Sequence, residues 1–357
     1  MSGLEGVVAA ETVLSHVDGE AGRLVIRGHD LEGLAGRMSY ERALAVLWEG
    51  LIDVGKANEL PRVIGEARER AFADFTPLFA HAATLDAFSA MRFLMASIGD
   101  GGPLAGPAGQ VGAMAVAAAA ATRLTAGAEP IPPDREAAHA GDLLRMATGQ
   151  LRSPAEISAL DTYLVTVIDH GLNASTFTAR VVASTGADYG SAVLAALGAL
   201  RGPLHGGAPG PVLDMLDAIG SAGNAVPWLE AALDRKERLM GFGHRIYRTR
   251  DPRADVLKRA LGRMDGRGAR LVLAEYVERT ALDLLARRKA GRRLDVNVEF
   301  YTALLLDGIG LPREAFTPVF ACGRVGGWLA HCAEQAADGR LIRPQSRYVG
   351  PMPGKAA

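Results

Sequence analysis

The segment Gly241–Arg253 (GFGHRIYRTRDPR) combines residue types that suit an anionic substrate. It places His244 just after two glycines and among four arginines: Arg245, Arg248, Arg250 and Arg253. Arginine grips carboxylates and phosphates through paired hydrogen bonds, and histidine transfers protons near neutral pH. Glycine lets the backbone approach a ligand closely. The segment predicts a site for a multiply charged anion with a proton-transfer group at its centre, although a solvated basic turn has the same composition.

Two more histidines lie in polar or glycine-rich surroundings. His170 begins the run HGLNAST, three residues before Asn173, so both lie on one helical face if the preceding helix continues. A helix C-terminus with satisfied polar side chains is the simpler interpretation. His205 lies in the run GPLHGG, where its neighbours carry little side chain and a ligand can reach it. An incidental histidine in a tight turn is the alternative there.

Glu299 lies in the apolar run VNVEFY, which opens a predicted helix. Apolar neighbours raise the pKa of a carboxyl group toward the range of a general base. A glutamate in the first turn of a helix is also favoured by the helix dipole, without any catalytic role. Taken alone, Glu299 fits the second interpretation better.

The elements that must position these residues are mostly helices. Of the 357 residues, 49% are hydrophobic, and alanine and leucine dominate over aromatic and β-branched types, which predicts an all-α, mainly helical protein. The expected elements are a small hairpin from Thr12–Val17 and Leu24–Arg27, and helices over Tyr40–Leu51, Leu85–Ile98, Val111–Leu124 and from Ser153 to about Asp169. A further helix is expected around the apolar stripe Leu273, Val277, Ala281 and Leu284, with Glu275, Glu278, Arg279 and Asp283 on its polar side. Residues 262–268 are expected to form a surface loop.

Composition and charge exclude several classes of protein. The formal net charge of -1 gives no global attraction to nucleic acid or to an anionic membrane. Cys322 and Cys332 are too few for a disulfide framework, have no zinc-binding spacing, and fit a reducing cytoplasm as buried small residues. The longest uncharged run, Gly101–Thr122, is broken by prolines and is a poor membrane span. We expect a cytoplasmic protein without a signal peptide, a metal site or a nucleic-acid partner.

Together these segments resemble the citrate synthase family, which includes bacterial-type citrate synthases and 2-methylcitrate synthases. The resemblance covers essentially the whole chain and is weakest over Ile52–Leu151, where only the general helical pattern matches. The matching stretches are Gly3–Ala35, Asp169–Thr185, Leu200–Ala208, Gly241–Ala254, Val296–Tyr301, Phe316–Gln335 and Leu341–Pro351.

The resemblance implies a helical homodimer in which each chain has two domains. Residues 1–206 and 316–357 would form the large domain, residues 207–315 the small domain, and the active site would lie in the cleft between them. The implied reaction is a Claisen-type condensation of acetyl-CoA with oxaloacetate, followed by hydrolysis of citryl-CoA to citrate and CoA. This is an acyltransferase reaction of the tricarboxylic acid cycle. It uses no metal and no permanently bound cofactor, because acetyl-CoA and CoA are substrate and product.

The resemblance also implies a role for each candidate residue. His205 would hydrogen-bond the thioester oxygen, Glu299 would remove a proton from the acetyl methyl group, and His244 would polarise the ketone of oxaloacetate. The remaining oxaloacetate ligands would be His170, Arg253, Arg324 and, from the other subunit, Arg343. The CoA adenine would lie against Met240, Gly241, Phe242 and Gly243, with Arg248 near the phosphates. His331 matches a family pattern and is expected to have a structural role.

Two positions depart from the family pattern. Glu299 replaces the usual Asp, and one extra methylene moves the carboxylate by roughly 1 Å, a misplacement that can cost about 100-fold in rate. Pro209 replaces the usual Asn and removes a backbone donor at the start of a helix. Two alternatives therefore stay open: a 2-methylcitrate synthase that uses propionyl-CoA, and a catalytically weak ligand-binding or regulatory protein.

Overall fold

The computed structural model describes Leu4 and residues 6–203, 205–206, 209–244, 246–264, 268–288 and 294–353. Several positions of the predicted segments lie outside the described residues: Gly3, Gly207, Ala208, Arg245 and residues 265–267 of the expected loop. No described helix is long and apolar enough to cross a membrane.

The chain begins with a small antiparallel sheet, which confirms the predicted hairpin. Its strands are β1 (Ser15–Asp18), β2 (Arg23–Ile26) and β3 (His29–Asp30), in the order β1-β2-β3. The turn between β1 and β2 spans residues 19–22, and Ser15 pairs with Ile26. The third strand was not predicted. Arg27 and Gly28 both have positive φ, 48° and 80°, and so form a tight turn without the Asn-Gly or Asp-Gly signal that usually marks one.

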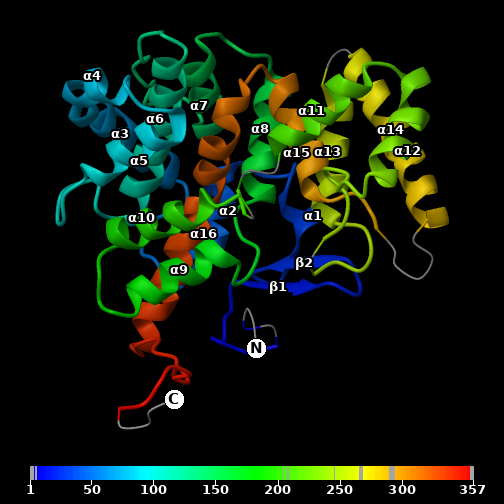
Figure 1. Cartoon of the computed structure of the whole chain (residues 1–357). Coiled ribbons are helices and arrows are strands. Elements are labelled where there is room, and N and C mark those ends of the chain that lie inside the picture. Colours follow the sequence, from blue (N-terminus) through cyan, green and yellow to red (C-terminus); the bar gives the residue numbers. More distant parts are fainter. Residues whose placement is uncertain are drawn as a thin grey trace.

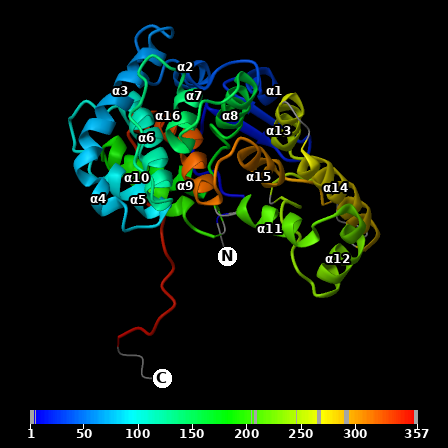
Figure 2. The same cartoon turned by 90° about the horizontal axis from the view of Figure 1, so that it is seen from above.

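Helices make up most of the described remainder, and Figures 1 and 2 show them in two groups. The larger group contains α2 (Tyr40–Trp48), α3 (Leu60–Phe75), α4 (Phe79–Ala82), α5 (Ala87–Ala96), α6 (Pro107–Thr125), α7 (His139–Thr148), α9 (Ala174–Ala183), α10 (Tyr189–Leu200) and α16 (Phe316–Asp338). The smaller group contains α11 (Pro209–Ile219), α12 (Ala222–Asp234), α13 (Pro252–Arg263), α14 (Ala269–Arg288) and α15 (Val298–Gly308). Between them lie α1 (Leu31–Leu34) and α8 (Pro154–Thr166), and α8 packs against both α7 and α13. The short 3-10 helices are η1 (Thr76–Leu78) and η2 (Arg313–Ala315).

The alanine-rich helix α6 forms the centre of the larger group. Every residue from Gly109 to Thr122 is buried, and the helix packs against α3, α5, α7 and α16. Small side chains permit this close contact on several sides. A Cβ added to Gly112 would lie only 2.7 Å from the Cβ of Ala67 in α3. The uncharged run is therefore a core helix of a helical protein.

The start of α8 confirms the predicted capping signal. Ser153 Oγ accepts a hydrogen bond from the Glu156 backbone N–H at 3.3 Å, and Glu156 Oε2 accepts one from the Ser153 N–H at 2.8 Å. The helix ends at Thr166, three residues before the expected end at Asp169.

The prediction that Glu278 lies on the solvent side of its helix was wrong. Its relative exposure in α14 is only 4%. Arg250 Nη1 and Lys258 Nζ donate to its carboxylate at 2.7 and 2.9 Å, and the Tyr301 hydroxyl donates as well. Three donors from other elements compensate for the buried charge, and helical periodicity alone does not reveal them.

Candidate active site

His170 lies in the loop between α8 and α9, beside Gly171 with its positive φ of 58°. Asn173 is the N-cap of α9, where its side chain accepts from the Thr176 N–H at 3.2 Å. The preceding helix α8 ends at Thr166 and does not continue through His170, so His170 and Asn173 do not share a helical face, and Asn173 instead caps the start of α9. His170 is buried, and burial together with nearby positive charge lowers its pKa well below the usual range.

The loop that carries His244 lies alongside the segment that leads into α15. Phe242 forms an antiparallel β-bridge with Val296, and Gly243 N–H donates to Asp295 O at 2.8 Å. Gly241 and Gly243 both have a φ of +82°, which favours glycine. A Cβ on Gly241 would lie 2.8 Å from the Cβ of Phe300. Glycine at 241 thus lets the loop that leads to His244 pack against α15, the helix that carries Glu299.

His244 is oriented by the backbone that follows it. Its Nδ1 accepts hydrogen bonds from the N–H groups of Ile246 at 3.0 Å and Tyr247 at 3.1 Å, so its Nε2 carries the ring proton. Arg253 Nη2 lies 3.2 Å from this Nε2. With Nε2 protonated, both groups are donors and cannot bond to each other, so a ligand oxygen that accepts from both would satisfy them. Burial, followed by the charge of Arg253, lowers the pKa of His244 to about 4, so the ring is neutral at pH 7.

His170 and His244 are close neighbours. Their ring centroids lie 5.8 Å apart in an edge-to-face arrangement. The hydroxyl of Tyr247 lies 3.2 Å from His170 Nε2, and its ring centroid is 4.7 Å from that of His244. Two segments 74 residues apart in the sequence therefore meet at one point, since His170 precedes α9 and His244 precedes α13.

Arg253 is held by Asp251, a residue that the sequence pattern alone did not single out. Asp251 is the N-cap of α13, and its carboxylate accepts from Arg253 Nε at 3.0 Å and from Nη2 at 2.8 Å. The same carboxylate accepts from the Val298 N–H at 3.1 Å, which joins α13 to the first turn of α15. The sequence could have predicted this cap, because an Asp followed by Pro is typical of a helix start.

Glu299 lies in the first turn of α15, where Asn297 caps the helix by accepting from the Glu299 N–H at 3.0 Å. Burial raises the pKa of the Glu299 carboxyl to about 7; Arg253 and Arg324 oppose the shift and Asp251 adds to it. The residue thus has both predicted properties, a first-turn position and a pKa near neutrality. A carboxyl group with such a pKa can accept a proton and return it at pH 7.

His205 lies just after α10, near the start of α9. Its Nε2 is 2.8 Å from Ser175 Oγ, which also accepts from Trp328 Nε1 at 3.1 Å. The Ser175 hydroxyl has two acceptors within reach, His205 Nε2 and Asn173 Oδ1 at 2.9 Å. When the hydroxyl turns toward His205, Nδ1 of that ring carries the proton and can donate to a ligand. Burial, followed by the charge of Arg324, lowers the pKa of His205 to about 4.

Arg324 in α16 links these groups electrostatically. It is 2% exposed, its Nε donates to Val167 O, and its guanidinium lies 4.9 Å from the Phe320 ring centroid. Within the described residues its two terminal nitrogens donate to no protein atom. Its charge acts on the pKa values of His170, His205 and Glu299, so all three candidates lie within electrostatic range of one guanidinium. A buried cation with free terminal nitrogens is suited to bind a carboxylate.

The other candidates lie outside this cluster. Arg343 is exposed in the segment after α16, which leads away from the helices in Figures 1 and 2. Arg248 is exposed, and its side chain makes no hydrogen bond within the described part of the chain. Met240 is partly buried, while Phe242 is buried against Phe300, with ring centroids 5.4 Å apart.

A family model described as "Citrate synthase, C-terminal domain" matches residues 3–345. The chain belongs to the citrate synthase family. The expected resemblance and the mainly helical fold are both confirmed.

Relatives within the citrate synthase family match almost the whole chain. The citrate synthase of Haloferax volcanii is 39% identical over 98% of this chain and 95% of its own length. The putative citrate synthase 2 of Mycobacterium tuberculosis is 38% identical over 98% of this chain and 93% of its own.

Solved citrate synthases have the same fold. The crystal structure of the Thermotoga maritima enzyme superposes with a TM-score of 0.85 at 34% identity and covers 99% of this chain and 97% of that one. The Thermoplasma acidophilum enzyme, solved in a ternary complex with carboxymethyl coenzyme A and oxaloacetate, has a TM-score of 0.84 at 26% identity. That comparison covers 99% of this chain and 96% of the other.

Proposed function

We propose that this member of the citrate synthase family condenses acetyl-CoA with oxaloacetate and hydrolyses citryl-CoA to citrate and CoA. The observation that carries the proposal is the set of titratable groups beside two buried arginines: His205 near Arg324 and His244 near Arg253, both with pKa values of about 4, and Glu299, influenced by both arginines, with a pKa of about 7. The neutral imidazoles can donate hydrogen bonds to oxygens that become negative, and the carboxyl group can exchange a proton at neutral pH.

Oxaloacetate would bind between the two arginines and the two neighbouring histidines. The free terminal nitrogens of Arg324 and the remaining donors of Arg253 would hold the carboxylates. The converging donors, His244 Nε2–H and Arg253 Nη2–H, would meet an oxygen of the bound keto acid. His170, 5.8 Å from His244 between ring centroids, would bind from the opposite side. This arrangement polarises the ketone without a metal ion.

Acetyl-CoA would be activated by Glu299 and His205. Glu299 removes a methyl proton while His205 donates a hydrogen bond to the thioester oxygen, where negative charge builds up. One such donor is worth about 3–4 kcal/mol in comparable oxyanion sites. The resulting enolate carbon attacks the ketone carbon, and the new alkoxide takes the Nε2 proton of His244, which the proton held by Glu299 replaces. Water then adds to the thioester carbonyl of citryl-CoA, and CoA leaves as the thiol with a proton from that water. The acyl group becomes an alkyl substituent, so the reaction is that of an acyltransferase.

CoA would bind along the loop Met240–Gly243, with its phosphates near Arg248. The loop backbone is fixed by its hydrogen bonds to residues 295–297, and Arg248 is exposed with an unpaired side chain in the described structure. An exposed arginine next to a rigid loop suits a flexible, phosphate-bearing ligand.

We propose the domain division 1–206 with 316–357, and 207–315, because α11–α15 form a separate group in Figures 1 and 2. A homodimer would bring Arg343 of each chain to the site of the other. In support, both ends of the described chain expose large hydrophobic side chains, among them Val8 at 85% and Val349 at 84% exposure. Unpaired, buried cysteines fit a cytoplasmic enzyme of the tricarboxylic acid cycle.

The experiment is an assay of free thiol released from acetyl-CoA by the purified protein, with and without oxaloacetate. Oxaloacetate-dependent thiol release together with citrate formation supports the proposal. Faster thiol release from propionyl-CoA than from acetyl-CoA would assign a 2-methylcitrate synthase instead. Oxaloacetate binding without any thiol release would refute catalysis and leave a ligand-binding protein.

A further inference from the structure

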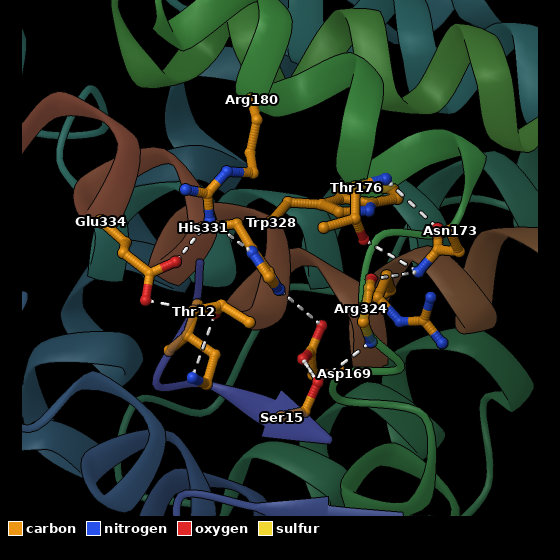
Figure 3. A network of polar contacts seen from close by, with 12 residues as sticks. Thr12, Ser15, Asp169, Asn173, Thr176, Arg180, Arg324, Trp328, His331 and Glu334 are labelled. Carbon is orange, nitrogen blue, oxygen red and sulfur yellow. Dashed lines mark hydrogen bonds and ion pairs between the residues drawn. The ribbon is translucent and has the colours of Figure 1, made fainter. Parts of the chain in front are cut away.

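The β1 strand contacts the loop that carries His170. Ser15 Oγ accepts from the Gly171 N–H at 3.0 Å and donates to Asp169 Oδ2 at 2.5 Å. Figure 3 shows Ser15 on the strand beside Asp169. The hydroxyl therefore holds the residues on both sides of His170.

The turn that follows β1 contacts the loop that carries His244. Arg248 N–H donates to Gly19 O at 2.8 Å. A Cβ on Gly19 would lie 2.4 Å from Ile246 O, and one on Gly22 would lie 2.5 Å from Thr249 Oγ1. The turn and the segment 246–250 thus meet closely enough that a side chain at Gly19 or Gly22 would force a shift. In Figure 1 the yellow-green loop before α13 lies beside the blue hairpin.

The contact with Ile246 and Arg248 acts on the His244 ring. Ile246 and Tyr247 donate their N–H groups to His244 Nδ1, at 3.0 and 3.1 Å, and the hairpin turn packs on this same stretch of backbone. Displacing the stretch would change the direction in which His244 Nε2–H points.

The base of the hairpin is itself anchored to the buried helix α16. Val13 N–H donates to Glu334 Oε1 at 2.9 Å, and Asp169 Oδ1 lies 3.2 Å from His331 Nε2. Arg180 donates to His331 Nδ1 at 3.0 Å and pairs with Glu334, which closes the network in Figure 3. His331 has the structural role expected of it, and the strand cannot shift without breaking these bonds.

We propose that the hairpin is a positioning strap that sets His170 and His244 at the correct separation for one substrate, with Ser15 and Gly19 as its positioning residues. The four-residue step from Ser15 to Gly19 spans about 13 Å of extended chain and reaches from one histidine loop to the other. The strap rests on the proposed function, because its substrate is the oxaloacetate of that reaction.

The first test compares Gly19→Ala with the control Gly33→Ala. Neither glycine has a positive φ, but only at position 19 would the added Cβ meet backbone, since nothing lies within 4 Å of a Cβ at Gly33. We expect Gly19→Ala to raise KM for oxaloacetate about tenfold or more. The reason is that the substitution would displace His244, and a displacement of about 1 Å in a site can lower the reaction rate about 100-fold. KM for acetyl-CoA should change little. A purely structural role would lower the amount of active protein without raising KM for oxaloacetate alone.

Amide hydrogen exchange tests the strap even if the protein proves inactive. In Gly19→Ala the Arg248 amide should exchange faster than in Gly33→Ala, whereas core amides in α6 should be unchanged. Equal exchange and equal oxaloacetate KM in the two variants would overturn the strap. Absence of thiol release by the unaltered protein would refute the proposed function and leave the exchange result to decide the strap.

A double-mutant cycle with Ser15→Ala tests whether the two ends act together, and Ser15→Ala provides a second variant if Gly19→Ala fails to fold. Ser15→Ala should raise the exchange rate of the Gly171 amide and the KM for oxaloacetate. Because one broken end already loosens the strap, the double variant should raise KM by clearly less than the product of the single effects. A simple product would mean that the two contacts are independent, and would overturn the proposal.

Discussion

At the scale of single residues, Glu299 carries the most specific chemistry. Its carboxyl group is in the first turn of α15, and burial raises its pKa to about 7. The backbone at the start of this helix is fixed by hydrogen bonds to the side chains of Asn297 and Asp251.

Glu299→Gln should lower kcat by about 100- to 10,000-fold, the range for loss of a positioned base. KM for oxaloacetate should stay nearly constant, because the arginines and histidines that bind it are unchanged. Steady-state kinetics with Glu129→Gln as an exposed control would check this. Retention of more than a tenth of the activity would remove Glu299 from the mechanism.

The raised pKa of Glu299 also predicts a pH-dependent stability. Below the unfolded value of 4.5 the group is neutral in both states, and as pH rises through the folded value of about 7 its burial increasingly opposes folding. Glu299→Gln should therefore match the unaltered protein at pH 4.5 and be more stable at pH 8, by on the order of 2–3 kcal/mol. Denaturant unfolding at the two pH values measures the difference. Equal stability at pH 8 would contradict the raised pKa.

At the scale of elements, Asp251 connects two helices that carry candidate residues. Asp251→Asn leaves Arg253 buried without its paired charge, which typically costs about 3–5 kcal/mol. It should also raise KM for oxaloacetate, because Arg253 loses the contact that orients it. The matched control is Asp234→Asn at an exposed ion pair with Arg288, where the change should cost less than about 1 kcal/mol. Equal losses of stability in the two variants would contradict the role of Asp251.

The elements also differ in how far sequence predicts them. The start of α8 was predictable because its cap and its partner lie three residues apart. The turn between α8 and α9 was harder to predict, because it depends on the end of α8 at Thr166, on the left-handed φ of Gly171 and on the choice of Asn173 as a cap. The burial of Glu278 depends on hydrogen-bond partners more than 19 residues away in sequence, so the helical periodicity around Glu278 cannot predict it. Local hydrogen bonds are readable from sequence, whereas contacts between distant segments are not.

Composition and the family resemblance identified the candidate residues of the site. They did not identify the residues that hydrogen-bond to these candidates. His244 and Glu299 stand out as polar groups in a glycine-rich and an apolar run, whereas Arg324 was assigned by the resemblance alone. Tyr247 and Ser175 look like ordinary residues in the sequence, and only the folded chain brings them against His170 and His205.

At the scale of the whole molecule, α6 sets the spacing of the larger group of helices. Gly112→Ala improves intrinsic helix propensity, but its Cβ would lie 2.9 Å from the Arg68 backbone N, so the helices must move apart. We expect a loss of about 1–3 kcal/mol, as for overpacked cores. Gly262→Ala in α13, with nothing within 4 Å, is the control and should be neutral or stabilising. Thermal unfolding would check this, and an unchanged midpoint for Gly112→Ala would contradict it.

Because both cysteines are buried, thiol reagents should not react with the folded protein. Cys322 and Cys332 are at most 2% exposed, and burial raises the pKa of Cys332 to about 12 and that of Cys322 higher still. Ellman's reagent should therefore give colour only from liberated CoA while the protein is native. In denaturant the same reagent should detect two equivalents per chain, so one dye reports turnover in buffer and the fraction of unfolded molecules in urea.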